Sequence, residues 1–120
     1  MADHNNLGTR GEKLAVELLT KKGYSILAEN WRSGKNELDI IARIGETAVF
    51  VEVKTRSTAF FGDPSDAISI AKQRRIIQAA NVYLVLFELD LEARFDVFLI
   101  VASGGEPVLD HIEDAFYPLA

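Results

Sequence analysis

The segment TAVFVEVKT, residues 47–55, restricts the fold more than any other part of the chain. Its valines and its phenylalanine are typical of a buried β-strand. The same segment carries Glu52 and Lys54, and burying a charge is unfavourable unless the charge is paired or used. Side chains alternate in direction along a strand, so Phe50, Glu52 and Lys54 share one face. The segment therefore predicts a buried strand whose two charged side chains must either form ion pairs or serve a function.

The surrounding pattern places this strand in an α/β domain. Helical and alternating periods, with Gly, Pro and Ser at the breaks, indicate where the elements lie. They predict a helix over 9–22, strands over 24–31, 37–44 and 47–55, a loop at 60–66, a helix from Pro64 or Ser69 to about Phe87, and strands over 94–102 and 107–112. The order α-β-β-β-α-β-β predicts a mixed β-sheet flanked by helices on both faces. The 120 residues fit one domain, with flexible tails expected at 1–7 and 113–120.

Composition excludes several classes of protein. No apolar run reaches the ~18 residues of a membrane span, and the first residues, MADHNN, do not resemble a signal peptide. Cysteine is absent, which excludes disulfides and thiolate metal sites. His4 and His111 lie near the two ends, so neither a histidine-based zinc site nor a Ser-His-Asp triad is expected. We expect a cytoplasmic protein without a membrane partner.

The charges are distributed unevenly. The formal net charge of −5 alone does not favour a nucleic-acid partner. Residues 1–75, however, hold twelve of the thirteen Lys and Arg residues and ten acids, whereas residues 76–120 hold Arg94 and eight acids. If several acids of the first part bind a cation, that part becomes clearly positive. Net charge informs partners rather than fold, so nucleic acid stays open as a partner.

Two acids of neighbouring strands are expected to meet. In the strand over 37–44, Glu37, Asp39 and Ile41 share a face. If this strand forms a hairpin with 47–55, Asp39 and Glu52 can lie side by side. Like charges at that separation repel each other, and when buried they require a cation or a shared proton.

The first helix adds a third acid. Its inward stripe, at spacings of three and four, consists of Gly8, Glu12, Ala15 and Leu19. Glu12 is therefore predicted on the core side. Glu17 has Arg10, Lys13 and Lys21 around it, and we interpret it as a solvated ion-pair residue.

The second helix brings basic residues to the same region. Its predicted core stripe consists of Ile76, Ala80, Tyr83, Leu84 and Phe87. One turn earlier the stripe reaches Lys72 and Gln73, so polar residues begin the buried face. Arg74 and Arg75 flank them and could contact phosphates.

Glu12, Asp39, Glu52 and Lys54 are thus predicted to converge from three elements. Hard oxygen ligands without His or Cys suit Mg²⁺ or Mn²⁺. A lysine beside carboxylates and a metal ion can position or activate a water, which is the chemistry of phosphodiester hydrolysis. The alternative is that Glu52 and Lys54 form an ion pair on an edge strand that discourages aggregation. That role does not explain the alignment of Asp39 and Glu12.

These residues resemble a known signature. Asp39 with Glu52-Val53-Lys54 is similar to the D…(D/E)-x-K motif of the PD-(D/E)XK, restriction-endonuclease-like superfamily, and GTRGEKLA, residues 8–15, resembles the N-terminal helix of archaeal Holliday-junction resolvases. The whole chain resembles the YraN-like family of small bacterial proteins, usually described as predicted endonucleases. The matching blocks are GEKLAVELLTKKGYSILAENWR, NELDIIA, VFVEVKTRS, FGDPSDAISIAKQRRI and RFDVF. The family usually has Gly-Glu-Ile-Asp where this chain has Asn36-Glu37-Leu38-Asp39; both acids remain, and only the turn differs.

The resemblance implies a role for each matching residue. Asp39, Glu52 and the Val53 carbonyl would bind Mg²⁺ or Mn²⁺, and Glu12 would hold a second ion or a water on it. Lys54 would orient the attacking water and stabilise charge at the pentavalent phosphorus, and Glu37 would support the ligands from outside. The residues implied in phosphate contact are Arg56, Lys72, Gln73 and Arg75. The alternative is that they are ordinary surface charges, because phosphate contacts carry little specificity.

The functional hypothesis is therefore a Mg²⁺-dependent DNA endonuclease, resolvase-like, with DNA, including branched DNA, as partner. The resemblance also leaves a homodimer open. The first alternative is a non-catalytic module on a nuclease-derived fold that binds nucleic acid or a protein, because fold does not imply function. A different metal hydrolase is the second alternative, and no small-molecule pocket signature supports it.

Overall fold

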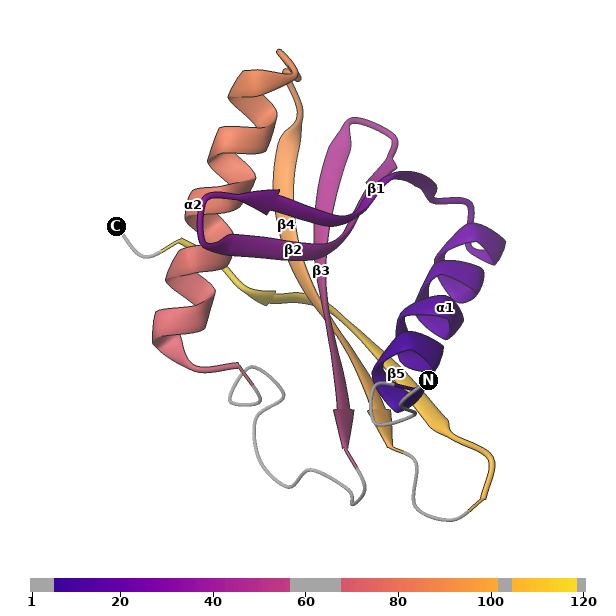
Figure 1. Ribbon diagram of the computed structural model, residues 1–120. Coiled ribbons are helices and arrows are strands. Elements are labelled where there is room, and N and C mark those ends of the chain that lie inside the picture. Colours follow the sequence, from indigo (N-terminus) through magenta and orange to yellow (C-terminus); the bar gives the residue numbers. More distant parts are fainter. Residues whose placement is uncertain (1–5, 57–67, 102–104, 119–120) are drawn as a thin grey trace.

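The described part of the chain folds into a single mixed sheet with two helices against it (Figure 1). The computed structural model describes residues 6–56, 68–101 and 105–118. The elements are α1 (Asn6–Lys21), β1 (Ser25–Ser33), β2 (Asn36–Ile44), β3 (Thr47–Arg56), α2 (Ile70–Leu86), β4 (Glu92–Val101) and β5 (Val108–Phe116). The predicted order α-β-β-β-α-β-β and the mixed sheet are confirmed.

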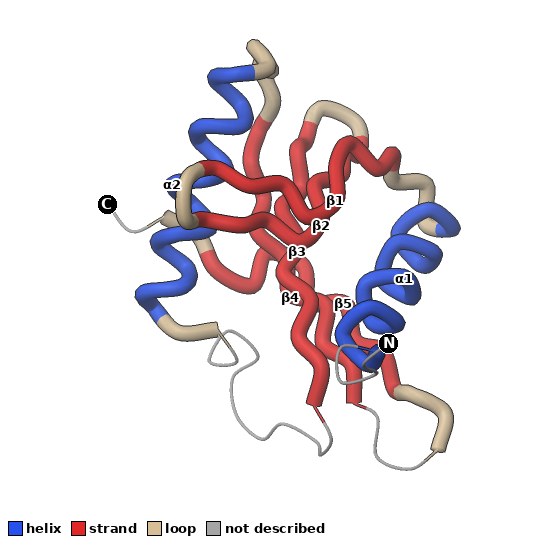
Figure 2. Tube along the Cα trace, viewed as in Figure 1, coloured by secondary structure: helices blue, strands red, loops and turns tan. Residues whose placement is uncertain are grey.

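The strands lie side by side in chain order, β1-β2-β3-β4-β5. The pairs β1–β2, β2–β3 and β4–β5 are antiparallel, and β3–β4 is parallel because the chain crosses over through α2. Figure 2 shows α1 and α2 on opposite sides of the strands, as predicted.

Local signals explain where the helices begin and end. α1 ends before Gly23, whose φ of 95° lies in the region that glycine adopts without strain. α2 begins after Ser69, whose hydroxyl accepts the backbone N–H of Lys72 at 3.1 Å. This agrees with Ser69 rather than Pro64 as the start of the predicted helix. The predicted loop at 60–66 and Pro64 itself lie outside the described residues.

Each helix covers its own apolar cluster. The cluster under α2 combines aliphatic residues with aromatic ones that include Phe50, Tyr83 and Phe95, and the rings of Phe50 and Phe95 are stacked 5.6 Å apart. The cluster under α1 includes Leu19 and Phe98, both fully buried. The sheet is thus buried on both faces, which accounts for the apolar character of β3 and β4.

The feature that positions the candidate site is the point where β2 leaves β3. Their pairing runs from Ile44 opposite Thr47 to Ile40 opposite Val51 and stops there. β3 continues to Arg56 while paired with β4 alone. One edge of β3 is therefore open from Glu52 onward, between α1 and α2 (Figure 1).

The C-terminal end differs from the prediction. β5 runs from Val108 to Phe116 rather than over 107–112, so residues 113–116 belong to the sheet and not to a tail. The register of β4 and β5 shifts between Phe95 and Val97. Within this shift, the N–H of Asp114 donates to the buried carboxylate of Asp96 at 3.0 Å, an attachment that sequence periodicity does not show. At the other end, α1 already begins at Asn6, inside the predicted tail 1–7. None of the helices in the described residues is long and apolar enough to cross a membrane.

Candidate active site

Asp39 and Glu52 meet where β2 leaves β3. The carboxylate of Asp39 accepts the backbone N–H of Val53 through Oδ2 at 2.9 Å, in place of the ladder bond that β2 no longer provides. Continuing the register of Ile40 and Val51 by one residue puts Asp39 opposite Glu52. The two side chains share a hydrogen bond, and Glu52 is only 7% exposed. The predicted pairing of these two acids is therefore present.

Burial and mutual repulsion change how this pair titrates. Burial, followed by the negative charge of Asp39, raises the pKa of Glu52 to about 7, against the lowering effect of Lys72. Burial also raises the pKa of Asp39, although the bonds from Val53 N–H and Glu52 act in the opposite direction. A hydrogen bond between two carboxyl groups requires a proton on one of them. Near neutral pH the two carboxyl groups can therefore share one proton.

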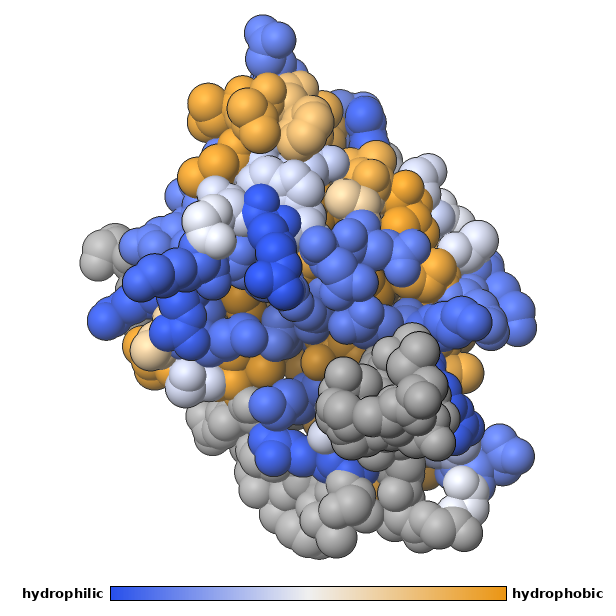
Figure 3. Space-filling model, viewed as in Figure 1, coloured by the Kyte–Doolittle hydropathy of each residue, from blue (hydrophilic) through white to orange (hydrophobic). Residues whose placement is uncertain are grey.

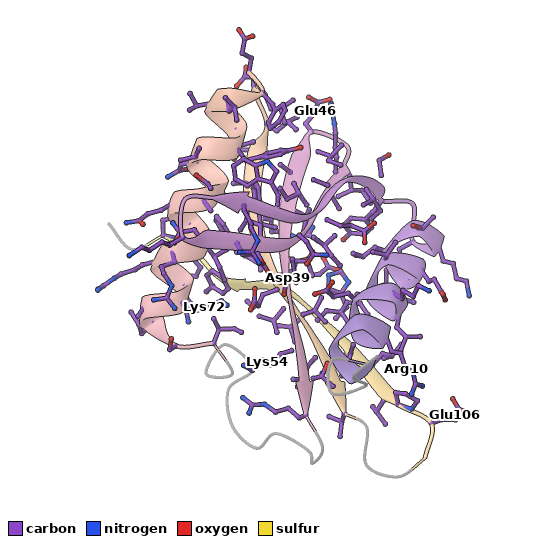
Figure 4. All side chains as sticks on the ribbon, in the orientation of Figure 1. Arg10, Asp39, Glu46, Lys54, Lys72 and Glu106 are labelled. Carbon is purple, nitrogen blue, oxygen red and sulfur yellow. The ribbon has the colours of Figure 1, made fainter. Side chains whose placement is uncertain are left out.

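Lys72 approaches the pair from α2, and Lys54 lies farther along β3 (Figure 4). Lys72, in the first turn of α2, places its Nζ 3.3 Å from Oε2 of Glu52. Lys54 is half-buried on β3, two residues beyond Glu52 and on the same face by strand alternation. It forms no ion pair with any of the described residues. β3 has an open edge from Glu52 onward, but Glu52 pairs with Lys72 of α2 and not with Lys54. The alternative of a Glu52–Lys54 ion pair is therefore wrong.

The backbone of Val53 faces the same gap. Its N–H is turned toward Asp39 and away from β4. In an extended strand the N–H and C=O of one residue point to the same side. The Val53 carbonyl therefore points to the open edge of β3, the side on which Asp39 lies and on which its predicted role as a ligand would require it.

Glu12 approaches Asp39 from α1, on the flank of the buried stripe. The fully buried positions of α1 include Ala15 and Leu19, whereas Glu12 is half-buried. Burial raises the pKa of Glu12, the hydrogen bond with Asn30 lowers it, and the charge of Asp39 raises it further. Glu12 therefore lies at the edge of the helix–sheet contact, on the side of Asp39, rather than on the buried stripe where the sequence placed it.

Two further predictions on α1 concerned Glu17 and Gly8. Glu17 is exposed, as expected, but it forms no ion pair with the described residues. The surroundings of Gly8 lie outside the described side chains.

The acids near the gap do not form a group of three. Within residues 6–56, 68–101 and 105–118, no three His, Asp or Glu side chains lie close enough together to hold a metal ion. Glu37 bonds to Arg32 at 2.8 Å, and its charge helps to raise the pKa values of Asp39 and Glu12. The carboxylates that meet are those of Asp39 and Glu52.

The residues implied in phosphate contact have different surroundings. Lys72 is directed at Glu52, and Gln73 donates through Nε2 to the carbonyl of Ile68 at 3.0 Å, which fixes its amide. Arg56 is half-buried at the end of β3, and Arg75 is exposed on α2. Lys72 thus contacts the paired carboxylates directly, through Glu52.

Sequence reasoning missed a second buried acid, Asp96. It is fully buried on β4 and accepts two bonds from Arg94, at 2.9 and 2.8 Å, and one from His111 Nε2 at 2.7 Å. Burial alone would raise the pKa of Asp96, but the bonds from His111, Arg94 and Asp114 N–H outweigh it and hold the pKa below its ordinary value. The available signal was an acid in the apolar run RFDVF, the same signal that singled out Glu52.

Comparison with known proteins places this arrangement in a family. A family model described as "Uncharacterised protein family UPF0102" matches residues 11–100, which include the acids and both lysines of the site. The chain belongs to the UPF0102 family. A UPF0102 protein of Flavobacterium psychrophilum is 50% identical over 117 residues, and one of Bacteroides thetaiotaomicron is 45% identical over 118 residues. In both cases the match covers 98% of this chain and 98% of the relative. The predicted resemblance to the YraN-like family is confirmed at the level of UPF0102 membership.

Proposed function

We propose that this UPF0102 protein is a Mg²⁺-dependent DNA endonuclease, resolvase-like in type, that hydrolyses phosphodiester bonds. The observation that carries the proposal is the buried pair of Asp39 and Glu52, which share a hydrogen bond at the open edge of β3. Two buried acids side by side are unfavourable for folding alone, and such perturbed groups concentrate at functional sites. The resemblance of Asp39, Glu52 and Lys54 to the nuclease signature supports this choice of reaction.

The donor set fits a hard divalent cation. Asp39, Glu52 and the Val53 carbonyl offer oxygen ligands around one gap, and Mg²⁺ commonly takes one or two protein carboxylates together with water and phosphate. When bound, the ion would supply positive charge beside the scissile phosphate and lower the pKa of a water. Glu12 would act from the edge of the site through a water or a second ion, because it faces Asp39 without joining a group of three acids.

Lys54 and Lys72 would have different roles in the reaction. Lys54 would hydrogen-bond the attacking water and the phosphate oxygens, because it is a compact cation on the same face as Glu52. Lys72 is paired with Glu52 at 3.3 Å. Once a cation neutralises Glu52, Lys72 would be available to a phosphate of the DNA backbone.

Melting and cleavage measured on the same proteins test this proposal. We expect Mg²⁺ or Mn²⁺ to raise Tm, because a ligand that binds only the folded state stabilises it. We also expect metal-dependent cleavage in a panel of duplex, single-stranded, flap and four-way-junction DNA. Asp39→Asn should lose both effects, yet keep or raise the metal-free Tm, because one of two repelling carboxylates is gone. Glu17→Gln, on the exposed face of α1, is the matched control and should behave as wild type.

The alternative function makes the opposite prediction. A non-catalytic binding module would bind DNA or a protein without a divalent-ion shift in Tm and without cleavage of any DNA in the panel. An unchanged titration of Asp39→Asn would show that the proposed cation site is wrong.

A further inference from the structure

The outward face of α2 changes character along the helix. Its exposed positions recur at spacings of three and four and begin with Arg74, Arg75 and Gln78. They continue with Val82 and Val85, and the apolar patch comprises Val82, Val85, Leu86 and Phe87, which are 45%, 77%, 63% and 51% exposed. Figure 3 shows apolar atoms gathered at this end of the molecule. Single exposed apolar residues are ordinary, but a contiguous group marks a contact surface.

The charges along α2 oppose its helix dipole. Lys72, Arg74 and Arg75 lie near the N-terminal end, and Glu88 and Asp90 follow the C-terminal end. A helix is stabilised by acids near its first turn and bases near its last turn, and α2 has neither. The ion pair with Glu52 accounts for Lys72 at this end of the helix. No residue of the described chain forms an ion pair with Arg74 or Arg75. This order of charges suits a neighbour whose own charges run in the opposite direction.

We infer that two copies of the chain associate through antiparallel α2 helices, with a two-fold axis near Val82. Such a contact is isologous, so each copy supplies the same surface. The apolar patches would meet at the centre, and a hollow lined by Asn81, Val82, Val85 and Leu86 would receive an apolar side chain of the partner. The acidic end of each copy, Glu88 and Asp90, would lie beside Arg74 and Arg75 of the other.

This charge pattern favours a second copy over other occupants. A helix that lies on an anionic membrane carries Lys and Arg beside its apolar face, whereas Glu88 and Asp90 border this patch. The contact also leaves the candidate active site open. Lys72 points from α2 to the buried Glu52, while the patch is on the exposed side of the helix. The dimer therefore does not depend on the nuclease proposal.

Sedimentation equilibrium of the wild-type protein tests association. We expect the protein to dimerise as its concentration is raised to about 100 μM, a range over which a micromolar Kd can be measured. Val85→Lys should weaken association at least about tenfold, an effect of the size expected for a charge placed in an apolar interface. A lysine near a helix C-terminus favours the helix, so lost folding would not explain that result. Val108→Lys, at an exposed apolar residue on β5, is the matched control and should leave the dimer intact.

The antiparallel geometry has its own test, because the chain contains no cysteine. Val82→Cys, close to the proposed axis, should form a disulfide-linked dimer under mild oxidation, whereas Glu17→Cys, exposed on α1, should not. The double variant Arg74→Glu/Arg75→Glu should self-associate weakly and pair with Glu88→Lys/Asp90→Lys when the two are mixed. A wild-type monomer over the whole range, equal cross-linking of both cysteine variants, no pairing of the mixed variants, or binding of the patch to anionic vesicles would overturn the inference.

Discussion

Glu52 is the residue whose ionisation is most affected by the fold. Its pKa is raised from 4.5 to about 7, first by burial and then by Asp39. The folded state therefore binds more protons than the unfolded state between these pH values, and its stability falls as pH rises through this window. Asp39 acts in the same direction, because its pKa is also raised.

We predict that, without divalent ions, the free energy of unfolding decreases from about pH 4.5 to about pH 7. The contribution of Glu52 is on the order of 3 kcal/mol, at 1.36 kcal/mol per pKa unit. Urea unfolding at several pH values measures it. Glu52→Gln should flatten the profile, and Glu17→Gln should reproduce that of the wild type. A Glu52→Gln profile as steep as that of the wild type would contradict the assignment.

Lys54 provides a second prediction at the scale of single residues. Lys54→Ala should lower DNA cleavage by about 10²–10³-fold, the loss typical of one preorganised electrostatic group. Folding and DNA binding should change little, because Lys54 has no ion pair in the described chain and other basic residues remain. Lys54→Arg should not restore full activity, since a planar guanidinium does not replace a compact ammonium.

The measurements for Lys54 are cleavage rate, DNA affinity and melting on the same variants. Early melting or aggregation of Lys54→Ala with unchanged cleavage would show a purely structural lysine.

At the scale of elements, Gly11 sets the distance between α1 and the sheet. A Cβ built on Gly11 would lie 2.9 Å from Cδ1 of Ile100 and 2.9 Å from Oγ1 of Thr55. Ile100 is only 1% exposed, so it has little room to move. The absence of a side chain at Gly11 therefore allows the close approach that brings Glu12 toward Asp39.

We predict that Gly11→Ala destabilises the fold by about 1–3 kcal/mol, the usual cost of overpacking. This would occur although alanine is the better helix former by about 1 kcal/mol. Chemical denaturation measures the loss. Gly105→Ala is the control, because a Cβ there meets nothing within 4 Å. A stabilised Gly11→Ala protein would mean that helix propensity outweighs packing and that α1 can move away from β3.

Sequence periodicity predicted the elements well because their signals are local. Ser69 and Gly23 mark helix ends through their own side-chain and backbone chemistry, and alternation fixes which residues share a strand face. Periodicity could not show that β2 pairs with β3 only from Ile40 to Ile44, because that depends on how the whole sheet is shaped. For the same reason it placed Glu12 on the inward stripe, whereas the fold puts it on the flank.

At the scale of the whole molecule, the network around Asp96 joins distant parts of the chain. Arg94 donates to Asp96 and also to the hydroxyl of Tyr24, which is 70 residues away in sequence. His111 contacts Asp96 through Nε2 and the Nζ of Lys22 through Nδ1, at 2.7 and 2.9 Å. No local pattern predicts such contacts, since their partners are chosen by the fold. Asp96 thus connects β4, β5 and the segment that follows α1.

We predict that Asp96→Asn destabilises the protein by about 3–5 kcal/mol, because it leaves the charge of Arg94 without its buried partner. The control is Glu113→Gln, whose side chain is 55% exposed and lies 3.5 Å from Arg94. That exposed contact is worth about 0–1 kcal/mol. Urea unfolding at pH 7 separates the two variants. Because the pKa of Asp96 is lowered, its contribution is complete above its ordinary pKa and is lost as pH falls below it, opposite in sign to that of Glu52. Equal losses from the two variants would show that the buried network holds the molecule together no better than a surface ion pair.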